Sequence, residues 1–182
     1  KPEDILGYEL GGESYWGASF LSWSVFYMRR KNQQLQTSKQ DDPADPSSFT
    51  YYIDNVSSSE SYGLEITQSS QVNSFIQTDL SLGLLKTSFK DYQFENKPFE
   101  GRALPHAPSY NFSLGGRIKL TKALSLYTQV VGRGGFYYSD THNFKSKPYE
   151  VWNTHFDYKL KKWNLRLWAK NILNKRYPVR GF

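Results

Sequence analysis

Residues Tyr110–Leu120 read YNFSLGGRIKL, and their side chains alternate between two chemical classes. Apart from a glycine, one class is apolar: Tyr110, Phe112, Leu114, Gly116, Ile118 and Leu120. The intervening residues are Asn111, Ser113, Gly115, Arg117 and Lys119. Because successive side chains of a strand point to opposite faces, this period of two predicts a β-strand with one apolar and one polar face. Its length suits the ~9–11 residues of a strand that crosses an outer membrane.

Similar stretches recur along the chain, and eight candidate strands result. The clearest others are Leu124–Tyr138, Tyr149–Leu160 and Trp163–Lys170. Short turns are expected near Ser14–Gly17, Ser69–Asn73, Leu120–Ala123 and Lys161–Lys162. Long polar loops are expected at Gln33–Thr50, Gln93–Ser109, Ser139–Pro148 and from Asn171 onward.

Short and long connections alternate, so an antiparallel meander places all short turns at one end and all long loops at the other. Outer-membrane barrels are built in this way. The sequence therefore predicts an all-β fold, an antiparallel up-and-down meander of about eight long strands that forms a segment of a transmembrane β-barrel.

Composition narrows the class of protein further. No run approaches the ~20 consecutive apolar residues that a membrane-spanning helix requires. A hydrophobic fraction of 38% still suits a β-barrel, because only alternate residues of each strand face lipid. The 17% aromatic content gathers at strand ends, as in aromatic girdles. A soluble β-sandwich shows the same alternation and stays open as an alternative, although its strands are usually only about five or six residues long.

The sequence offers little catalytic or metal-binding chemistry. It has no cysteine, which excludes disulfides and thiol catalysis. Its histidines, His106, His142 and His155, are far apart and lack the spacing of a metal pair. The carboxylates of Lys39–Ser48 lack a calcium-binding spacing, so a solvated loop is expected there. The net charge of +6 comes from scattered residues. We therefore expect no enzyme, no cofactor, no bound metal and no nucleic-acid partner.

One motif near the end of the chain resembles a known family. Residues 168–177 read WAKNILNKRY, an apolar strand end followed by Asn171, Lys175 and Tyr177. This is similar to the strand-end motif Asn-Leu-x-Asp/Asn-Lys-x-Tyr of TonB-dependent outer-membrane receptors. Three further elements match that family in its order: Tyr8–Gly11 (YELG), Ser61–Glu65 (SYGLE) and Gly101–Pro108 (GRALPHAP). Within them, the matching positions are Tyr62, Gly63, Glu65, Pro105 and Pro108.

This resemblance implies a bacterial outer-membrane transporter whose barrel is filled by an N-terminal plug domain. Such receptors import scarce ligands with TonB-derived energy; ferric siderophores are the commonest cargo, and haem, cobalamin and sugars also occur. The implied partners are outer-membrane lipid, the plug domain of the same receptor, TonB and a ferric siderophore. We recognise no plug, TonB box or final strand within residues 1–182, so we expect a partial barrel with two open strand edges, which invite pairing with other copies.

Basic and aromatic residues of the long loops are the candidate cargo-binding residues. They are Tyr92, Phe94, Arg102, His106, Tyr138, His142 and Lys145. Cations attract an anionic chelate, and aromatic rings stack on catechol groups. Residues on the polar strand faces are expected to contact the plug or water instead: Arg117, Arg133, Asn153, Asp157 and Arg166. A passive porin and a soluble β-sandwich binding module stay open as alternative functions.

Overall fold

The computed structural model describes residues 2–94, 97–140 and 143–179, and these ranges contain β-strands but no helix. The strands are β1 (Asp4–Trp16), β2 (Ser19–Gln40), β3 (Phe49–Gln71), β4 (Ile76–Phe89), β5 (Gln93–Phe94), β6 (Lys97–Pro98), β7 (Tyr110–Lys119), β8 (Leu124–Arg133), β9 (Tyr149–Leu160) and β10 (Trp163–Ala169). No described residue belongs to a helix long and apolar enough to cross a membrane.

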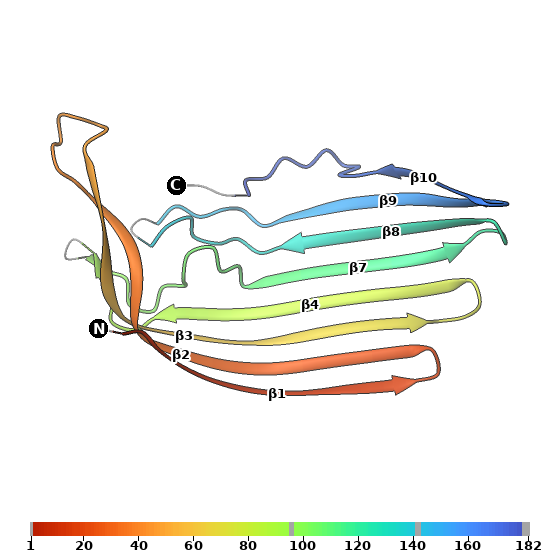
Figure 1. Ribbon diagram of the computed structural model, residues 1–182, viewed down its shortest axis with the longest axis horizontal. Coiled ribbons are helices and arrows are strands. Elements are labelled where there is room, and N and C mark those ends of the chain that lie inside the picture. Colours follow the sequence, from red (N-terminus) through yellow and green to blue (C-terminus); the bar gives the residue numbers. More distant parts are fainter. Residues whose placement is uncertain (1, 95–96, 141–142, 180–182) are drawn as a thin grey trace.

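Eight strands form one antiparallel sheet in the order β1-β2-β3-β4-β7-β8-β9-β10, while β5 and β6 pair in a small hairpin of their own (Figure 1). Each strand of the large sheet lies beside its neighbour in the sequence, apart from the inserted β5–β6 hairpin. The predicted all-β meander is confirmed. A β-sandwich needs two sheets packed face to face, so this single layer contradicts the sandwich alternative.

The connections separate into two groups at opposite ends of the sheet (Figure 1). The turn end carries residues 17–18, 72–75, 120–123 and 161–162, and the loop end carries residues 41–48, 90–109 and 134–148. Gly17 has φ +56°, the left-handed conformation required at the first position of its two-residue turn. The predicted alternation of short and long connections is confirmed, although β1 and β3 run to Trp16 and Gln71, past the predicted starts of their turns.

The predicted loop Gln33–Thr50 is wrong for most of its length. β2 and β3 stay paired from Gln33↔Val56 to Gln40↔Phe49, and only residues 41–48 form the turn. We call residues 33–56 the arm. It bends away from the sheet beyond Asn32, whose φ is +52° (Figure 1). The prediction of a loop rested on polar side chains, but the hydrogen bonds that pair two antiparallel strands join backbone groups and do not require an apolar face.

The predicted strand Leu124–Tyr138 is also too long. β8 ends at Arg133, where Gly134 and Gly135 follow. A Cβ atom on Gly135 would lie 2.5 Å from the backbone oxygen of Ser146, so the chain approaches its neighbour too closely there for a larger residue. The aromatic run Phe136–Tyr138 therefore belongs to the loop end and not to the sheet.

The sheet has two chemically distinct faces, which the register between strands defines. Leu10, Val25, Leu64, Leu84 and Tyr110 follow one another across five strands of what we call the apolar face. Residues one position along, such as Gly11, Ser24, Glu65, Gly83 and Asn111, belong to the polar face. Large apolar side chains such as Leu10, Leu114 and Leu167 are more than half exposed. The most buried apolar side chains lie mainly at the loop end instead: Phe89, Tyr92, Phe99 and Phe136.

Candidate functional site at the loop end

Two long connections, 90–109 and 134–148, approach each other at the loop end; their described parts, residues 90–94, 97–109, 134–140 and 143–148, pack together, and we call them the platform. Tyr137 joins them: it forms a parallel bridge with Pro105 and an antiparallel bridge with Lys145. The amide of His106 donates to the carbonyl of Tyr137 at 2.9 Å, and the amide of Tyr138 donates to the carbonyl of Phe144 at 3.1 Å. Main-chain bonds therefore hold the platform together.

Arg102 contacts both segments of the platform and is only 8% exposed. Its guanidinium donates to the carbonyl of Ser139 at 2.7 Å and to Oδ1 of Asn143 at 3.2 Å. Its carbon lies 4.3 Å from the ring centroid of Phe99 and 4.8 Å from that of Tyr137. Burial lowers the pKa of this guanidinium from its ordinary value, and these contacts offset the cost of burying the charge. Arg102 thereby links both platform segments.

An aromatic cluster lies beneath Arg102. Phe89 and Tyr92 have ring centroids 4.8 Å apart, and Tyr92 and Phe99 are 5.7 Å apart. Leu104 packs against this cluster, and its amide donates to Oγ1 of Thr87 at 2.9 Å. These residues come from the end of β4 and the connection that follows it, so burial of the rings fixes that connection on the sheet.

A second aromatic group surrounds Phe136, which is 1% exposed. Its ring lies 5.5 Å from the imidazole of His106 and 5.6 Å from the ring of Tyr138, and the guanidinium carbon of Arg133 lies 4.7 Å from it. The amide of Phe136 donates to Oγ of Ser146 at 2.9 Å. This group packs against His106, which is exposed, and Tyr138, which is half-buried.

The outer surface of the platform combines basic side chains with aromatic rings. His106 and Lys145 are exposed, and Nζ of Lys145 lies 4.8 Å from the ring centroid of Tyr137. Phe144 is 72% exposed. A small cavity of about 210 Å³ lies between the segments and is lined in part by Ala103, Phe136, Tyr137 and Lys145. Such a surface suits an anionic ligand with flat rings.

The structure brings most of the predicted cargo-binding residues into this platform. Arg102, His106, Tyr138 and Lys145 come together around Phe136 and Tyr137. Tyr92 and Arg102 are buried in its interior, which favours structural roles for both; a direct contact with cargo stays a prediction. His142 and the side chain of Phe94 lie outside the described residues.

Sequence reasoning did not assign Phe99, Phe136, Tyr137 or Phe144 to the site. The signal that would have identified Phe136 and Tyr137 is Gly134-Gly135, a pair that interrupts the strand and directs the following aromatic residues into the loop. Pro105 and Pro108 lie in the same connection, where Pro105 forms the bridge to Tyr137 and Pro108 is buried.

The strand-end motif forms a defined turn after β10. Asn171 and Asn174 both have positive φ, +51° and +48°, a conformation that asparagine tolerates better than most residues. The side chain of Asn171 accepts from the amide of Lys175 at 2.8 Å and donates to its carbonyl at 3.0 Å. The ring of Tyr177 stacks on Tyr149 of β9, with centroids 4.0 Å apart. The asparagines and the tyrosine therefore shape the chain as it leaves the sheet.

The Gly-x-Glu element lies in the middle of β3. A Cβ atom on Gly63 would lie 2.6 Å from the Phe26 ring and closer still to the carbonyl oxygen of Leu84, so only glycine fits there. Tyr62 is on the apolar face with Nζ of Lys86 5.8 Å from its ring centroid. Glu65 lies on the polar face and lines a hollow of about 350 Å³.

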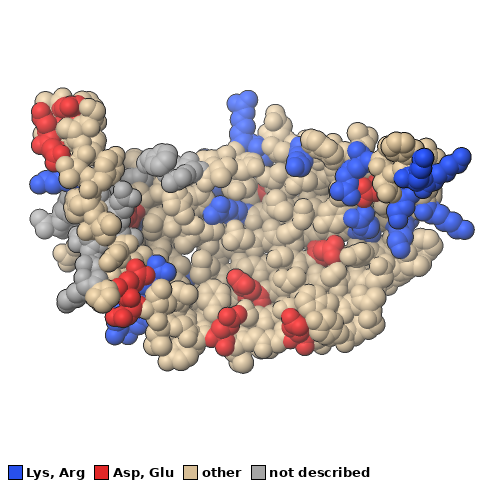
Figure 2. Space-filling view, in the orientation of Figure 1, with Lys and Arg blue, Asp and Glu red and all other residues tan. Residues whose placement is uncertain are grey.

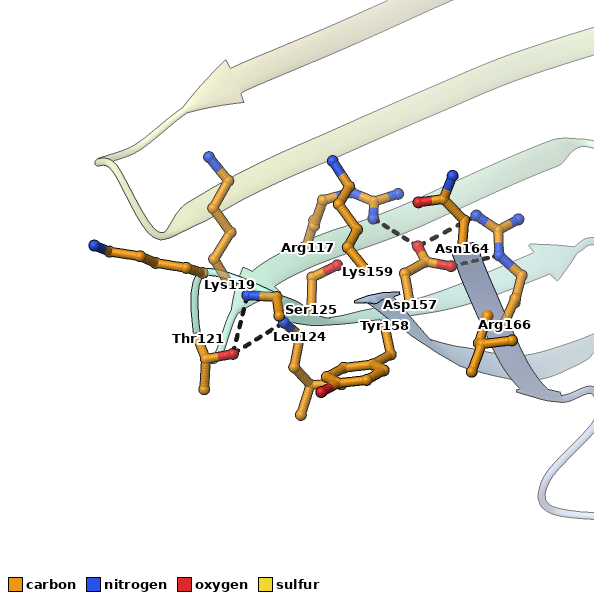
Figure 3. A pocket seen from close by; sticks show the side chains of 13 residues that line it. Arg117, Lys119, Thr121, Leu124, Ser125, Asp157, Tyr158, Lys159, Asn164 and Arg166 are labelled. Carbon is orange, nitrogen blue, oxygen red and sulfur yellow. Dashed lines mark hydrogen bonds and ion pairs between the residues drawn. The ribbon is translucent and has the colours of Figure 1, made fainter. Parts of the chain in front are cut away.

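A basic hollow of about 890 Å³ lies at the turn end of β7–β10, on the polar face (Figure 3). Asp157 lies within it and accepts from Arg117 at 3.0 Å and from Arg166 at 2.6 and 3.2 Å. Nε2 of His155 lies 3.3 Å from the same carboxylate. The sequence placed Arg117, Asp157 and Arg166 on polar strand faces, and the structure brings both arginines into contact with the Asp157 carboxylate.

Comparison with known proteins identifies the family. A family model described as "TonB dependent receptor-like, beta-barrel" matches residues 1–172. The chain belongs to the TonB-dependent receptor family. Its members are bacterial outer-membrane proteins, so the chain is a barrel segment of an outer-membrane receptor. This is a family of receptors and transporters and not of enzymes.

Solved structures of receptors share the fold at low sequence identity. The ferric yersiniabactin uptake receptor FyuA from Yersinia pestis has a TM-score of 0.79 and 17% identity, over 99% of this chain and 26% of FyuA. The copper transporter OprC has a TM-score of 0.79 and 16% identity, over 98% of this chain and 26% of OprC. The ferric-catecholate import receptor Fiu from K12 E. coli has a TM-score of 0.71 and 18% identity, over 97% of this chain and 24% of Fiu. The chain thus spans about a quarter of the length of these three proteins.

Proposed function

We propose that this chain is part of an energised outer-membrane importer whose cargo is an anionic ferric siderophore. The observation that carries the proposal is the platform, which exposes His106, Phe144 and Lys145, with the Lys145 ammonium over the ring of Tyr137. Positive charge attracts an anionic chelate and the rings offer stacking surfaces for catechol groups. FyuA and Fiu carry ferric complexes according to their descriptions, which supports the same cargo class here.

In this proposal the two faces of the sheet meet different surroundings. The apolar face contacts outer-membrane lipid, because its exposed leucines and aromatic residues are costly to leave in water. The polar face lines the lumen and contacts a plug domain of the same receptor. TonB supplies the energy, as the family implies. Residues 1–182 would then provide eight neighbouring strands of a larger barrel.

Copper is the second candidate cargo, because OprC has the same fold at the same TM-score as FyuA. Copper ions favour cysteine, methionine and histidine ligands. The sequence has no cysteine, one methionine and three histidines. Among the described residues no three His, Cys, Asp or Glu side chains cluster as metal ligands would. Chelated iron therefore suits the platform better than a bare metal ion.

Uptake by the full-length receptor tests the proposal. The receptor is expressed in cells that lack other ferric-siderophore receptors, and radioactive iron is supplied as ferric enterobactin, an anionic tris-catecholate probe. We expect uptake that stops when an uncoupler removes the proton gradient. The variant His106→Ala/Lys145→Ala should lower apparent affinity about tenfold, whereas Lys162→Ala, which removes a cation at the turn end, should leave it unchanged.

Other outcomes would reject parts of this proposal. Uptake that survives the uncoupler would indicate a passive porin. Import of copper without import of any ferric chelate would transfer the assignment to the second candidate. Equal affinity for the double variant and the wild type would remove the platform from the binding site.

A further inference from the structure

Three exposed lysines gather at the turn end of β7–β10. Lys122 lies in the turn that joins β7 to β8, and Lys161 and Lys162 form the turn that joins β9 to β10. The two turns are neighbours, because the amide of Lys159 donates to the carbonyl of Ala123 at 2.8 Å. We call Lys122, Lys161 and Lys162 the rim lysines. Figure 2 shows basic side chains gathered over this end of the sheet.

Ion pairs within the described part of the chain leave the rim lysines without a counter-charge. The described ion pairs join none of the three to a carboxylate. The carboxylate of Asp157 on β9 is taken up by Arg117 and Arg166 instead. An anionic partner from outside these strands can therefore bind the rim lysines without displacing an ion pair that the structure shows.

The positive charge is confined to one sector of the turn end. The turns of β1–β4, residues 17–18 and 72–75, contain no charged residue. Lys119 and Lys159 also lie at the turn end of β7–β10, but in Figure 3 they project on the same side as Arg117, which is the polar face. They increase the positive potential of this sector and are not among the residues beside the apolar face.

Exposed apolar side chains flank the rim lysines. Leu120 is two residues before Lys122, and Leu160 and Trp163 enclose the turn formed by Lys161 and Lys162. All three apolar side chains are exposed, Trp163 to 63%. Leu160 and Trp163 lie directly opposite each other in the strand register, on the apolar face. The lysines therefore begin where the apolar face ends.

A membrane around such a barrel places these lysines at a defined depth. Short turns of outer-membrane barrels face the periplasm, and the apolar band ends at the membrane interface. Lysine side chains extend along apolar surface and keep the ammonium group at the polar boundary. The lipids of the periplasmic leaflet are phospholipids, whose phosphate groups lie at this depth. Each lysine beside an anionic lipid surface favours binding about fivefold.

We propose that the rim lysines bind an anionic phospholipid of the periplasmic leaflet in preference to a zwitterionic one. The lipid phosphate lies against the ammonium groups of the two adjacent turns, and the acyl chains lie on Leu120, Leu160 and Trp163. A zwitterionic headgroup offers the same phosphate, but its own cation repels the lysines. This inference rests on the lipid contact of the apolar face proposed above and assigns a headgroup class to one part of it.

Native mass spectrometry of the full-length receptor tests the preference. Receptor stripped of lipid in detergent is titrated with phosphatidylglycerol or with phosphatidylcholine that has the same acyl chains, and the bound lipids are counted. We expect tighter binding of phosphatidylglycerol to the wild type. Lys122→Gln/Lys161→Gln should lower the affinity for phosphatidylglycerol about tenfold and leave that for phosphatidylcholine unchanged.

A matched variant separates the rim lysines from net charge. Lys39→Gln/Lys147→Gln removes two exposed lysines at the loop end, so it changes the net charge equally and should keep the wild-type preference. Both variants must first show the wild-type barrel's resistance to unfolding in cold SDS. Equal loss of affinity in the two variants would overturn the proposal. Equal affinity of the wild type for the two lipids would overturn it as well and would favour an acidic periplasmic protein at the rim.

Iron uptake by the wild-type receptor separates this inference from the proposed cargo. A receptor that prefers phosphatidylglycerol but imports no ferric enterobactin retains the lipid site and loses the cargo assignment. A receptor that imports ferric enterobactin without any lipid preference retains its cargo and loses the lipid site.

Discussion

Replacing Arg102 by alanine should loosen the whole platform, not only its own segment. The guanidinium holds residues 134–148 through Ser139 and Asn143, and it lies on the rings of Phe99 and Tyr137. Two hydrogen bonds from a charged donor contribute about 1.5 kcal/mol each, at the low end because water can replace the arginine. Two ring contacts contribute about 0.5 kcal/mol each. The sum is about 4 kcal/mol of local stability, which corresponds to about a 1,000-fold change in an opening equilibrium.

Hydrogen exchange of the intact receptor measures this opening. Exchange should accelerate in both 90–109 and 134–148, up to the limit set by unprotected amides, while β7 and β8 stay protected. Arg102→Lys keeps the charge but not the planar fork, so its effect should be intermediate. Lys147→Ala, which removes an exposed cation from the same loop, should have no effect. Acceleration confined to the segment that contains residue 102 would refute the idea that this arginine joins the two segments.

Three further substitutions test individual features, each by the thermal unfolding of the full receptor. Gly63→Ala should destabilise the receptor by about 2 kcal/mol, because the added Cβ would lie 2.6 Å from the Phe26 ring. Gly83→Ala should be neutral, because no atom outside the adjoining residues of the chain lies within 4 Å of the added Cβ. Equal melting temperatures of the two variants would contradict this steric argument. Asn171→Ala should lower the free energy of unfolding by about 2 kcal/mol, because alanine is strained at this positive φ and the hydrogen bonds to Lys175 are lost. Asn171→Gly should recover the part that is due to φ. A glycine variant no more stable than the alanine variant would assign the whole effect to the lost hydrogen bonds. Phe136→Ala should lower the free energy of unfolding by about 3 kcal/mol, because the ring is 1% exposed. Phe144→Ala should lower it little, because Phe144 is 72% exposed. A larger loss of stability in Phe144→Ala than in Phe136→Ala would show that the Phe136 ring does not support the platform.

The strands were predictable because each face imposes a period of two on the sequence. Tyr110–Leu120 and Tyr149–Leu160 alternate almost without exception, and β7 and β9 match them within one residue. The arm was not predicted because its β2 part, Gln33–Gln40, is almost entirely polar and has no apolar residues at a period of two. Only the backbone pairing from Gln33 to Gln40 distinguishes it from a loop.

The platform was half predictable. Residue types suggested Arg102, His106 and Lys145, because basic residues in a long loop are candidates for binding an anionic ligand. These residues come together because Tyr137 forms backbone bridges to both Pro105 and Lys145. Pro105 is more than thirty residues from Tyr137 in the sequence, and Lys145 is eight residues from it. Contacts of this kind follow from the packing of two loops, and no periodic pattern of residues in the sequence predicts them. For the same reason, the sequence did not predict that the Arg102 side chain is buried.

The main-chain bonding of the platform has a consequence for how such a receptor changes over evolutionary time. The bridges and amide bonds around Tyr137 use backbone groups, which persist whatever side chains the loop carries. His106, Phe144 and Lys145 face outward from this support. Substitutions at these three positions therefore change the chemistry of the outer surface without removing the main-chain bonds that support it. In the proposed importer, the outer surface can vary residue by residue, while Phe136 and the glycines before it stay constrained by packing.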